Sequence, residues 1–260
     1  MPISTIPHFH APYEQLVAAG DIPGTTGVNK FGGSSSIADG TTEEIWDGAV
    51  VYAWPTTAEI THIRTAADTP AMDGLDVEIQ GLDTDWGLVV QTATIDAATS
   101  TVTEVELTTP LKRVFRMKVT DSVVTTNDIW VGATGMAAAT AKGIIQTGNN
   151  QTLMAMYTIP AGKTGYMTKY YGSIIGEAGP PATIPDYVRF RLWNRDNVNG
   201  YAPQLKHEIG AAINGTSAIP PHNFAPYLKL TEKTDVWLTG TPDGDDAYVS
   251  AGFDIFLVDN

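Results

Sequence analysis

The sequence predicts an all-β protein in which two tandem antiparallel β-sandwich (jelly-roll-like) domains follow an extended N-terminal arm. Short runs of alternating apolar and polar residues recur about every ten residues, and clusters of Gly, Pro, Asp and Thr separate them. No segment keeps the helical period of about 3.6 residues over a long stretch, and prolines interrupt the second half. We expect the arm over residues 1–42, a first sandwich over residues 43–145 and a second over residues 146–260.

The arm is rich in residues that break regular structure. Four prolines and six glycines fall in the first 40 residues, which excludes long regular elements apart from a short helix around Pro12–Ala19. A disordered tail seldom carries large apolar side chains. The arm nevertheless carries a set that could bury against a partner or against the chain's own body, namely Ile3, Ile6, Phe9, Tyr13 and Leu16. These five are the predicted partner-docking residues.

The clearest strand of the first sandwich is LDVEIQ, where Leu75, Val77 and Ile79 point to one face and polar residues to the other. Further strands are predicted at residues 49–54, 58–65, 86–95, 101–107, 113–119 and 127–132. Residues 133–152 are small and polar, and we interpret them as a linker that holds one short strand in GIIQ.

The second sandwich is predicted from the same alternation. Its strands are expected at residues 152–159, 164–175, 187–194, 204–209, 227–240 and 247–258. In the last of these, the predicted buried row consists of Val249, Ala251, Phe253, Ile255 and Leu257. In YVRFRLW, Val188, Phe190 and Leu192 are expected to point inward and the two arginines outward.

Charge and composition exclude several classes of protein. The formal net charge of −14 and the pI near 4.5 argue against nucleic acid and against anionic membranes as partners, because both require a basic surface. The chain has no cysteine, so disulfides, thiol nucleophiles and cysteine-based metal sites are excluded. The first residues lack the pattern of a secretion signal, and no stretch approaches the roughly 18 apolar residues of a membrane span.

The residues that carry catalysis show no recognisable motif. The histidines are His8, His10, His62, His207 and His222, and none lies in a local signature of a Ser or Thr nucleophile. The GKT at residues 162–164 lacks the upstream glycine of a phosphate-binding loop, which argues against nucleotide binding. We expect no enzyme and no cofactor, although with 29 Asp and Glu residues a facing carboxylate pair stays open.

Three groups of residues could bind a metal ion, and each has a simpler interpretation. His8 and His10 supply only two ligands on an arm. DTDWG (83–87) and PDGDD (242–246) place several carboxylates in one loop, as calcium requires, but neither fits the EF-hand pattern. We favour hairpin turns, with a positive φ at Gly244, and predict no metal site.

Aromatic residues are the remaining candidates for ligand binding. Ten tyrosines accompany six tryptophans, which are Trp46, Trp54, Trp86, Trp130, Trp193 and Trp237. Such rings can stack on sugars, but they more often anchor cores and interfaces.

Five stretches of the chain carry a resemblance to a known family. They are GVNKFGGSSSIADGTTEEIWDG (27–48), GLDVEIQGLDTDW (74–86), YTIPAGKTGYM (157–167), EKTDVWLTG (232–240) and VSAGFDIFLVD (249–259). Together they resemble virion structural proteins of tailed bacteriophages, especially marine ones. In EKTD, Asp235 is expected to begin a strand and cap the preceding turn.

This resemblance implies a β-sandwich decoration or cement protein on the capsid exterior. Its implied partners are the major capsid protein or other virion proteins, and a homo-oligomer, with a trimer favoured, is implied as well. One alternative is a head- or tail-surface accessory protein that binds host glycans for attachment. A third interpretation is a carbohydrate-active enzyme.

Overall fold

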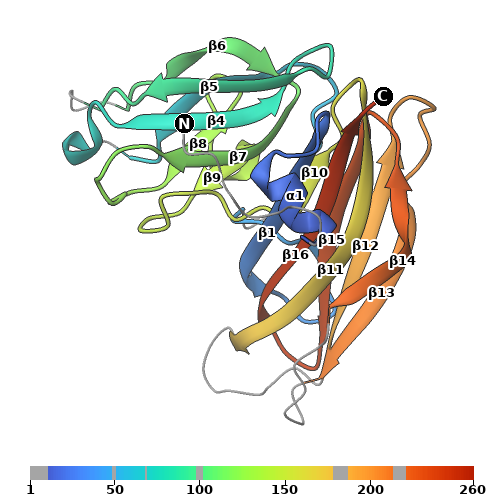
Figure 1. Cartoon of the computed structure of the whole chain (residues 1–260). Coiled ribbons are helices and arrows are strands. Elements are labelled where there is room, and N and C mark those ends of the chain that lie inside the picture. Colours follow the sequence, from blue (N-terminus) through green and yellow to red (C-terminus); the bar gives the residue numbers. More distant parts are fainter. Residues whose placement is uncertain (1–10, 49–50, 68, 98–101, 178–186, 213–220) are drawn as a thin grey trace.

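The computed structural model describes residues 11–48, 51–67, 69–97, 102–177, 187–212 and 221–260. Within these residues the protein is nearly all β, which confirms the predicted fold class (Figure 1). The helical elements are α1 (Tyr13–Ala19) and two single 3₁₀ turns, η2 (Pro70–Met72) and η3 (Ala138–Thr140). No helix in the described parts of the chain is long and apolar enough to cross a membrane.

Two sheets form the larger body, here called the C-terminal sandwich. One sheet has the order β1 (Thr25–Ile37), β16 (Ala247–Asp259), β11 (Lys163–Glu177) and β14 (His222–Leu230). The other has the order β10 (Met156–Thr158), β15 (Thr234–Asp243), β12 (Tyr187–Asp196) and β13 (Gln204–Ala212), and β2 (Glu43–Glu44) also pairs with β15. All described pairings within them are antiparallel.

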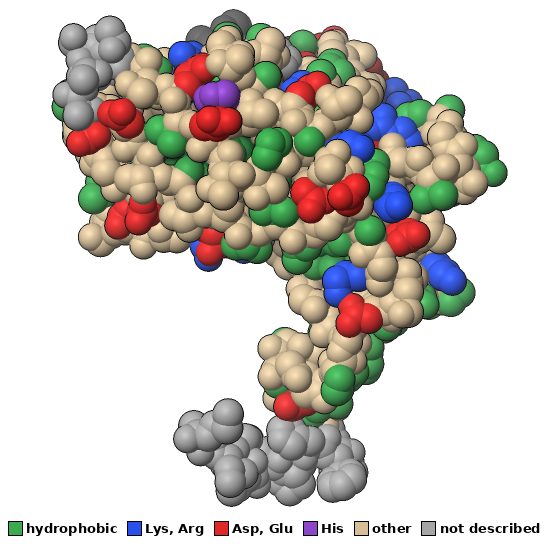
Figure 2. All heavy atoms as spheres, turned by 90° about the horizontal axis from the view of Figure 1, so that it is seen from above, with side chains coloured by type: hydrophobic (Ala, Val, Ile, Leu, Met, Phe, Trp, Pro, Cys, Tyr) green, Lys and Arg blue, Asp and Glu red, His purple; other side chains and the backbone are tan. Residues whose placement is uncertain are grey.

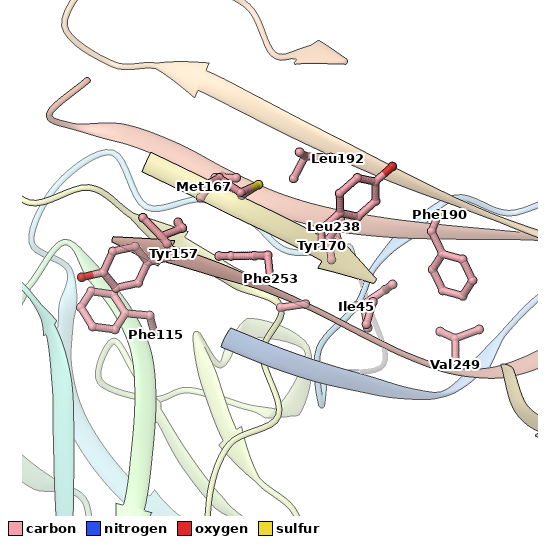
Figure 3. Close-up of a cluster of buried hydrophobic side chains, with 14 of the residues drawn as sticks. Ile45, Phe115, Tyr157, Met167, Tyr170, Phe190, Leu192, Leu238, Val249 and Phe253 are labelled. Carbon is pink, nitrogen blue, oxygen red and sulfur yellow. The ribbon is translucent and has the colours of Figure 1, made fainter. Parts of the chain in front are cut away.

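The core of this sandwich contains the side chains that the alternation predicted. Phe190, Leu192, Val249 and Phe253 are buried in one cluster, as Figure 3 shows. The whole predicted row of the last strand, from Val249 to Leu257, is buried. Burial of such side chains, at about 1.5–3 kcal/mol each, is the main stabilising contribution of the strands.

Two further sheets form the N-terminal sandwich. One has the order β6 (Val105–Leu111), β3 (Ile60–Thr65), β8 (Ile129–Gly132) and β9 (Gly143–Ile145). The other has the order β5 (Leu88–Thr94), β4 (Asp76–Leu82) and β7 (Arg113–Val119). Ile60, Val77, Ile79 and Met117 are fully buried between them, so the packing is that of a sandwich.

The prediction of an extended arm over residues 1–42 is wrong for Thr25–Ile37. These residues form β1, which pairs along its length with β16. The glycines that indicated breaks serve close packing instead, because a Cβ on Gly32 would lie 2.3 Å from the Ala155 backbone nitrogen. A strictly tandem order is therefore not confirmed, since β1 and β2 lie in sheets of the C-terminal sandwich. The short helix is confirmed as α1, which ends at Gly20 with φ 76°.

Two strand predictions also differ from the structure. Residues 51–54 form no strand, and Tyr52 instead packs its ring against Trp46 and Trp54, so the apolar alternation there reflects aromatic packing. The single strand expected over residues 227–240 is divided between β14 and β15 by a turn in which Lys233 has φ 59°. The short strand in GIIQ is confirmed as β9.

Candidate functional site

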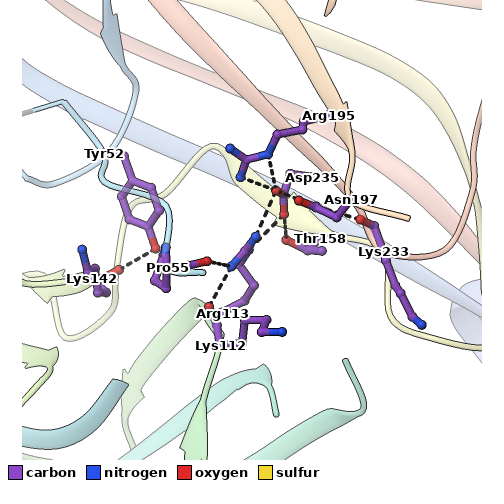
Figure 4. Close-up of polar contacts among 10 residues, drawn as sticks. All are labelled: Tyr52, Pro55, Lys112, Arg113, Lys142, Thr158, Arg195, Asn197, Lys233 and Asp235. Carbon is purple, nitrogen blue, oxygen red and sulfur yellow. Dashed lines mark hydrogen bonds and ion pairs between the residues drawn. The ribbon is translucent and has the colours of Figure 1, made fainter. Parts of the chain in front are cut away.

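The most highly connected polar group of the described chain lies where the two sandwiches meet. Asp235, at the start of β15, is fully buried. Arg113 donates two hydrogen bonds to the Asp235 carboxylate, from Nε to Oδ1 at 2.9 Å and from Nη2 to Oδ2 at 3.1 Å. Arg195 Nη2 donates to Oδ2 at 2.6 Å (Figure 4). Thr158 Oγ1 and Asn197 Nδ2 donate to the same carboxylate, at 2.6 and 2.8 Å. The sequence predicts that Asp235 begins a strand and caps the preceding turn. Asp235 does lie at the start of β15, but its carboxylate binds side chains of β7, β10 and β12 instead of capping the turn.

The charge state of Asp235 follows from these contacts. Burial alone would raise the pKa of this carboxyl, but the hydrogen bonds and charge of Arg113, together with Arg195 and Thr158, hold it below its ordinary value. The group is ionised and saturated with donors. A carboxylate in this state is a poor general base, because protonating it would break several charge-assisted hydrogen bonds.

Arg113 reaches this carboxylate from the N-terminal sandwich. Its side chain is only 4% exposed, and Nη1 donates to the backbone oxygens of Pro55 at 2.5 Å and Lys112 at 2.9 Å. The guanidinium lies 5.2 Å from the ring of Trp54 and 5.0 Å from that of Trp86. These contacts add cation–π attraction to the ion pair.

A pocket of about 300 Å³ opens beside the junction, with Trp54, Trp86, Arg195, Asn197 and Tyr201 in its wall. The indole of Trp54 also contacts the Arg195 guanidinium at 5.1 Å, and the indole of Trp86 contacts Lys112 Nζ at 4.6 Å. The ring faces that a sugar would need are thus engaged by cations of the chain itself. The junction is a structural joint between the sandwiches.

The other tryptophans are packed in a similar way. Trp46 and Trp237 are buried, and Trp130 lies under the Arg64 guanidinium at 5.1 Å. Trp193 stacks on Trp237 with ring centroids 6.4 Å apart. The six tryptophans thus act as core and interface anchors, and none of them is an exposed platform for a sugar ring.

A second link between the sandwiches was not indicated by any sequence pattern. Lys30 on β1 is buried, and its ammonium donates to the backbone oxygen of Phe115 on β7. Burial, with a smaller effect from the Arg116 charge, lowers the pKa of Lys30 to about 7. The ring of Phe115 packs against Tyr157 with centroids 4.6 Å apart.

A larger concavity, of about 510 Å³, lies on the outer face of the sheet that contains β1, β16, β11 and β14. Asp254 lies in its floor, where Asn29 Nδ2 donates to Oδ1 at 2.5 Å and Lys169 Nζ approaches Oδ2 at 2.9 Å. The hydrogen bond and charge of Asp254 raise the pKa of Lys169. Glu14 of α1 and Tyr227 of β14 also line it. We call this concavity the outer groove.

The predicted docking residues divide into two sets. Tyr13 and Leu16 lie on α1, and the Tyr13 ring packs edge-on against Phe256 of β16 with centroids 5.1 Å apart. The helix thus rests on the chain's own sheet, beside the outer groove. Ile3, Ile6 and Phe9 lie outside the described residues, as do His8 and His10.

The described histidines do not form a catalytic arrangement with a nucleophile. His207 of β13 stacks on His222 of β14 with ring centroids 3.7 Å apart, and the Tyr170 hydroxyl lies 2.5 Å from His207 Nδ1. Burial, and then the His222 charge, lower the pKa of His207. Because β13 and β14 belong to different sheets, this stack closes one edge of the C-terminal sandwich. His62 contacts Thr61 on β3.

The acidic segments DTDWG (83–87) and PDGDD (242–246) form the turns between β4 and β5 and between β15 and β16. Asp83 Oδ1 accepts the backbone N–H groups of Asp85 at 2.9 Å and Gly87 at 2.8 Å. Gly244 has φ 101°, so the predicted positive φ is confirmed, and its N–H donates to Asp39. Within the described residues, no group of three or more His, Asp or Glu side chains is placed to hold a metal ion.

Comparisons of the chain with protein-family models, curated protein sequences and solved structures found no match.

Proposed function

We propose that this chain is a structural protein of a tailed-phage virion, a decoration or cement protein that binds the capsid exterior and bridges its subunits. The observation that carries the proposal is the position of the resembling segments. Residues 27–48, 157–167, 232–240 and 249–259 supply β2 and parts of β1, β10, β11, β15 and β16, which belong to the two sheets of the C-terminal sandwich. Residues 74–86 supply β4 of the N-terminal sandwich. Four of the five resembling segments are far apart in sequence and come together in one framework, which supports the proposal.

The joint between the sandwiches supports a role in assembly. A protein that bridges subunits has to hold its contact surfaces at a defined angle, and the Arg113–Asp235–Arg195 network holds the two bodies together through buried charges. Removing either partner of such a network would leave a charge buried without compensation. The two sandwiches therefore act as one block.

The edge strand β5 supplies a contact surface on this block. Leu88 and Val90 point to the same side of the strand and are 52% and 57% exposed. They border a concavity of about 350 Å³ that Phe115 and Leu257 also line. Stable interfaces place apolar side chains at their centre, so we assign this strip to contact with the major capsid protein or with another copy.

The outside of the molecule shows charges of both signs. On the face in Figure 2, acidic side chains are scattered in small groups, and basic side chains lie mostly toward the right of the view. The net charge of −14 disfavours non-specific binding to nucleic acid and to anionic surfaces. A surface accessory protein that binds host glycans is the alternative function, and the outer groove is the feature that favours it.

The proposal is tested with purified protein and empty capsids of the phage that encodes it. Light scattering should show a stable oligomer, with a trimer favoured, and the protein should decorate capsids at a fixed stoichiometry. The double variant Leu88→Glu, Val90→Glu should lose occupancy by tenfold or more, because it places two charges in the interface. The matched control is Val124→Glu, because Val124 is also 57% exposed but lies outside β5. This variant should keep the wild-type capsid occupancy. A monomer that leaves capsids undecorated would overturn the proposal.

A further inference from the structure

We propose that the outer groove is a binding site for a neutral saccharide. The groove lies between α1 and β14, on the side of the sheet that faces away from the core of the C-terminal sandwich. Its volume of about 510 Å³ falls within the range of about 300–1,000 Å³ that is usual for small-molecule sites. This activity is separate from the capsid contact proposed for β5.

The floor of the groove presents hydrogen-bond donors and acceptors in fixed positions. Asp254 offers carboxylate oxygens, and Asn29 and Lys169, which both contact that carboxylate, offer N–H donors beside it. Two adjacent hydroxyl groups of a sugar can donate to such a carboxylate and accept from such donors at the same time. Thr168 and Asn223 add further polar groups to the lining.

The apolar part of the groove complements the less polar face of a sugar ring. The ring of Tyr227 is 45% exposed and stands edge-on to Phe256, with centroids 6.3 Å apart. Phe256 is itself held by Tyr13, so the aromatic wall is supported from two sides. An amphipathic ring beside ordered polar groups is a common arrangement in ligand sites.

The charges lining the groove favour an uncharged ligand. Its acidic groups are Glu14 and Asp254, whereas Lys169 is already paired with Asp254. An anionic ligand would meet this excess of negative charge, and the net charge of the chain adds to the repulsion. A neutral sugar avoids both costs, and the polar floor still satisfies its hydroxyl groups.

An extended peptide fits the floor less well than a saccharide does. Peptides that add to a sheet pair with a free edge, through backbone N–H and C=O groups. The floor strands β16 and β11 are paired on both sides, with β1 and β11 and with β16 and β14. Recognition at the floor must therefore come from side chains, which suits a ligand that carries many hydroxyl groups.

The test uses an array of neutral and acidic oligosaccharides, followed by calorimetric titration with the neutral sugar that gives the strongest signal. The wild-type protein should bind neutral sugars in preference to acidic ones. Tyr227→Ala and Asp254→Asn should each weaken binding by about tenfold or more. Tyr227→Phe should keep most of the affinity, because it retains the ring.

Tyr248→Ala is the matched control, since Tyr248 is 39% exposed on β16 but does not line the groove. It should bind as the wild type does, and thermal unfolding should show that all variants fold. An array without a neutral signal would overturn the proposal, and so would equal losses of affinity in Tyr227→Ala and Tyr248→Ala. Binding of a peptide of residues 1–12 in the groove of a protein that binds no sugar would also overturn it. Capsid occupancy of Tyr227→Ala should be unchanged, so the two proposals can fail separately.

Discussion

Arg113 of the N-terminal sandwich and Asp235 of the C-terminal sandwich form a two-pronged ion pair, with Nε–Oδ1 at 2.9 Å and Nη2–Oδ2 at 3.1 Å. Both side chains are almost completely removed from water, at 4% and 0% exposure. Arg195 binds the same carboxylate from β12. The stability of each sandwich is thereby connected to the position of the other.

Asp235→Ala should lower the free energy of unfolding by about 3–5 kcal/mol, because two guanidinium groups would lose their buried counter-charge. The matched control is Glu208→Ala, which breaks the more exposed pair with Arg191 and should cost no more than about 1 kcal/mol. Denaturant titration followed by circular dichroism measures both values. Similar losses in the two variants would show that the junction is not specially stabilising.

Much of the strand layout could be predicted from sequence, because burial on one face of a sheet imposes a period of two. The row from Val249 to Leu257 and the pair Phe190 and Leu192 are examples. The alternation could not show which strands pair. The sequence predicts an arm where the structure has β1, because Gly32 and Gly33 indicate breaks unless the backbone that packs against them is known.

The candidate sites were less predictable than the strands. Asp235, Arg113 and Arg195 are distant in sequence, and nothing local shows that they meet. The one available signal was an acid at the start of the apolar strand DVWL, where a buried charge demands a partner. The outer groove was missed because its residues come from α1, β1, β11, β14 and β16, which only the fold brings together.

The stacked histidines predict a loss of stability in mild acid. Burial and the His222 charge lower the pKa of His207 below its unfolded value of about 6.5. The unfolded chain therefore takes up a proton before the folded protein does, and stability falls as the pH drops from about 6.5 through the folded pKa. Among the described residues, His207 contacts the Tyr170 hydroxyl and the rings of His222 and Phe224, and none of these carries a negative charge that could offset its own.

His207→Gln should reduce the difference in unfolding free energy between pH 7.5 and pH 5.5, because it removes this titrating group. Equilibrium unfolding at the two pH values measures the difference. His62→Gln, which leaves the His207–His222 stack intact, should retain the wild-type difference. If both variants behave like the wild type, the stack does not control the response to acid.

Asp47 predicts a change of the opposite sign. Burial raises the pKa of Asp47 to about 7, although the Leu153 N–H donates to its carboxylate at 2.7 Å. The folded protein keeps this proton up to about pH 7, whereas the unfolded chain loses it near pH 4, so stability falls as the pH rises between these values. Asp47→Asn keeps an acceptor for Leu153 and cannot ionise.

Asp47→Asn should therefore raise the free energy of unfolding by about 1–3 kcal/mol at pH 8 and change it little at pH 4. Chemical denaturation at the two pH values checks this expectation. Asp85→Asn, in an exposed turn, is the control and should have little effect at either pH. A destabilised Asp47→Asn at pH 8 would mean that the carboxylate is ionised and favourable in the fold.

Two adjacent glycines of β1 test whether this segment belongs to the folded body. A Cβ on Gly32 would lie 2.3 Å from the Ala155 nitrogen and 2.4 Å from the Ile45 oxygen, both backbone atoms that cannot move alone. A Cβ on Gly33 would meet nothing closer than Leu153 Cδ1 at 3.6 Å. Gly32→Ala should therefore destabilise the protein by more than about 2 kcal/mol, because the strands have to separate.

Gly33→Ala should be neutral or slightly stabilising, by up to about 1 kcal/mol, because alanine restricts the unfolded chain. Thermal and denaturant unfolding of both variants measure the contrast. If residues 25–37 were an arm that contributes nothing to the isolated fold, the two substitutions would have the same small effect. A large loss confined to Gly32→Ala requires β1 to pack against Ile45 and Ala155 in solution, which would make it an integral strand of the C-terminal sandwich.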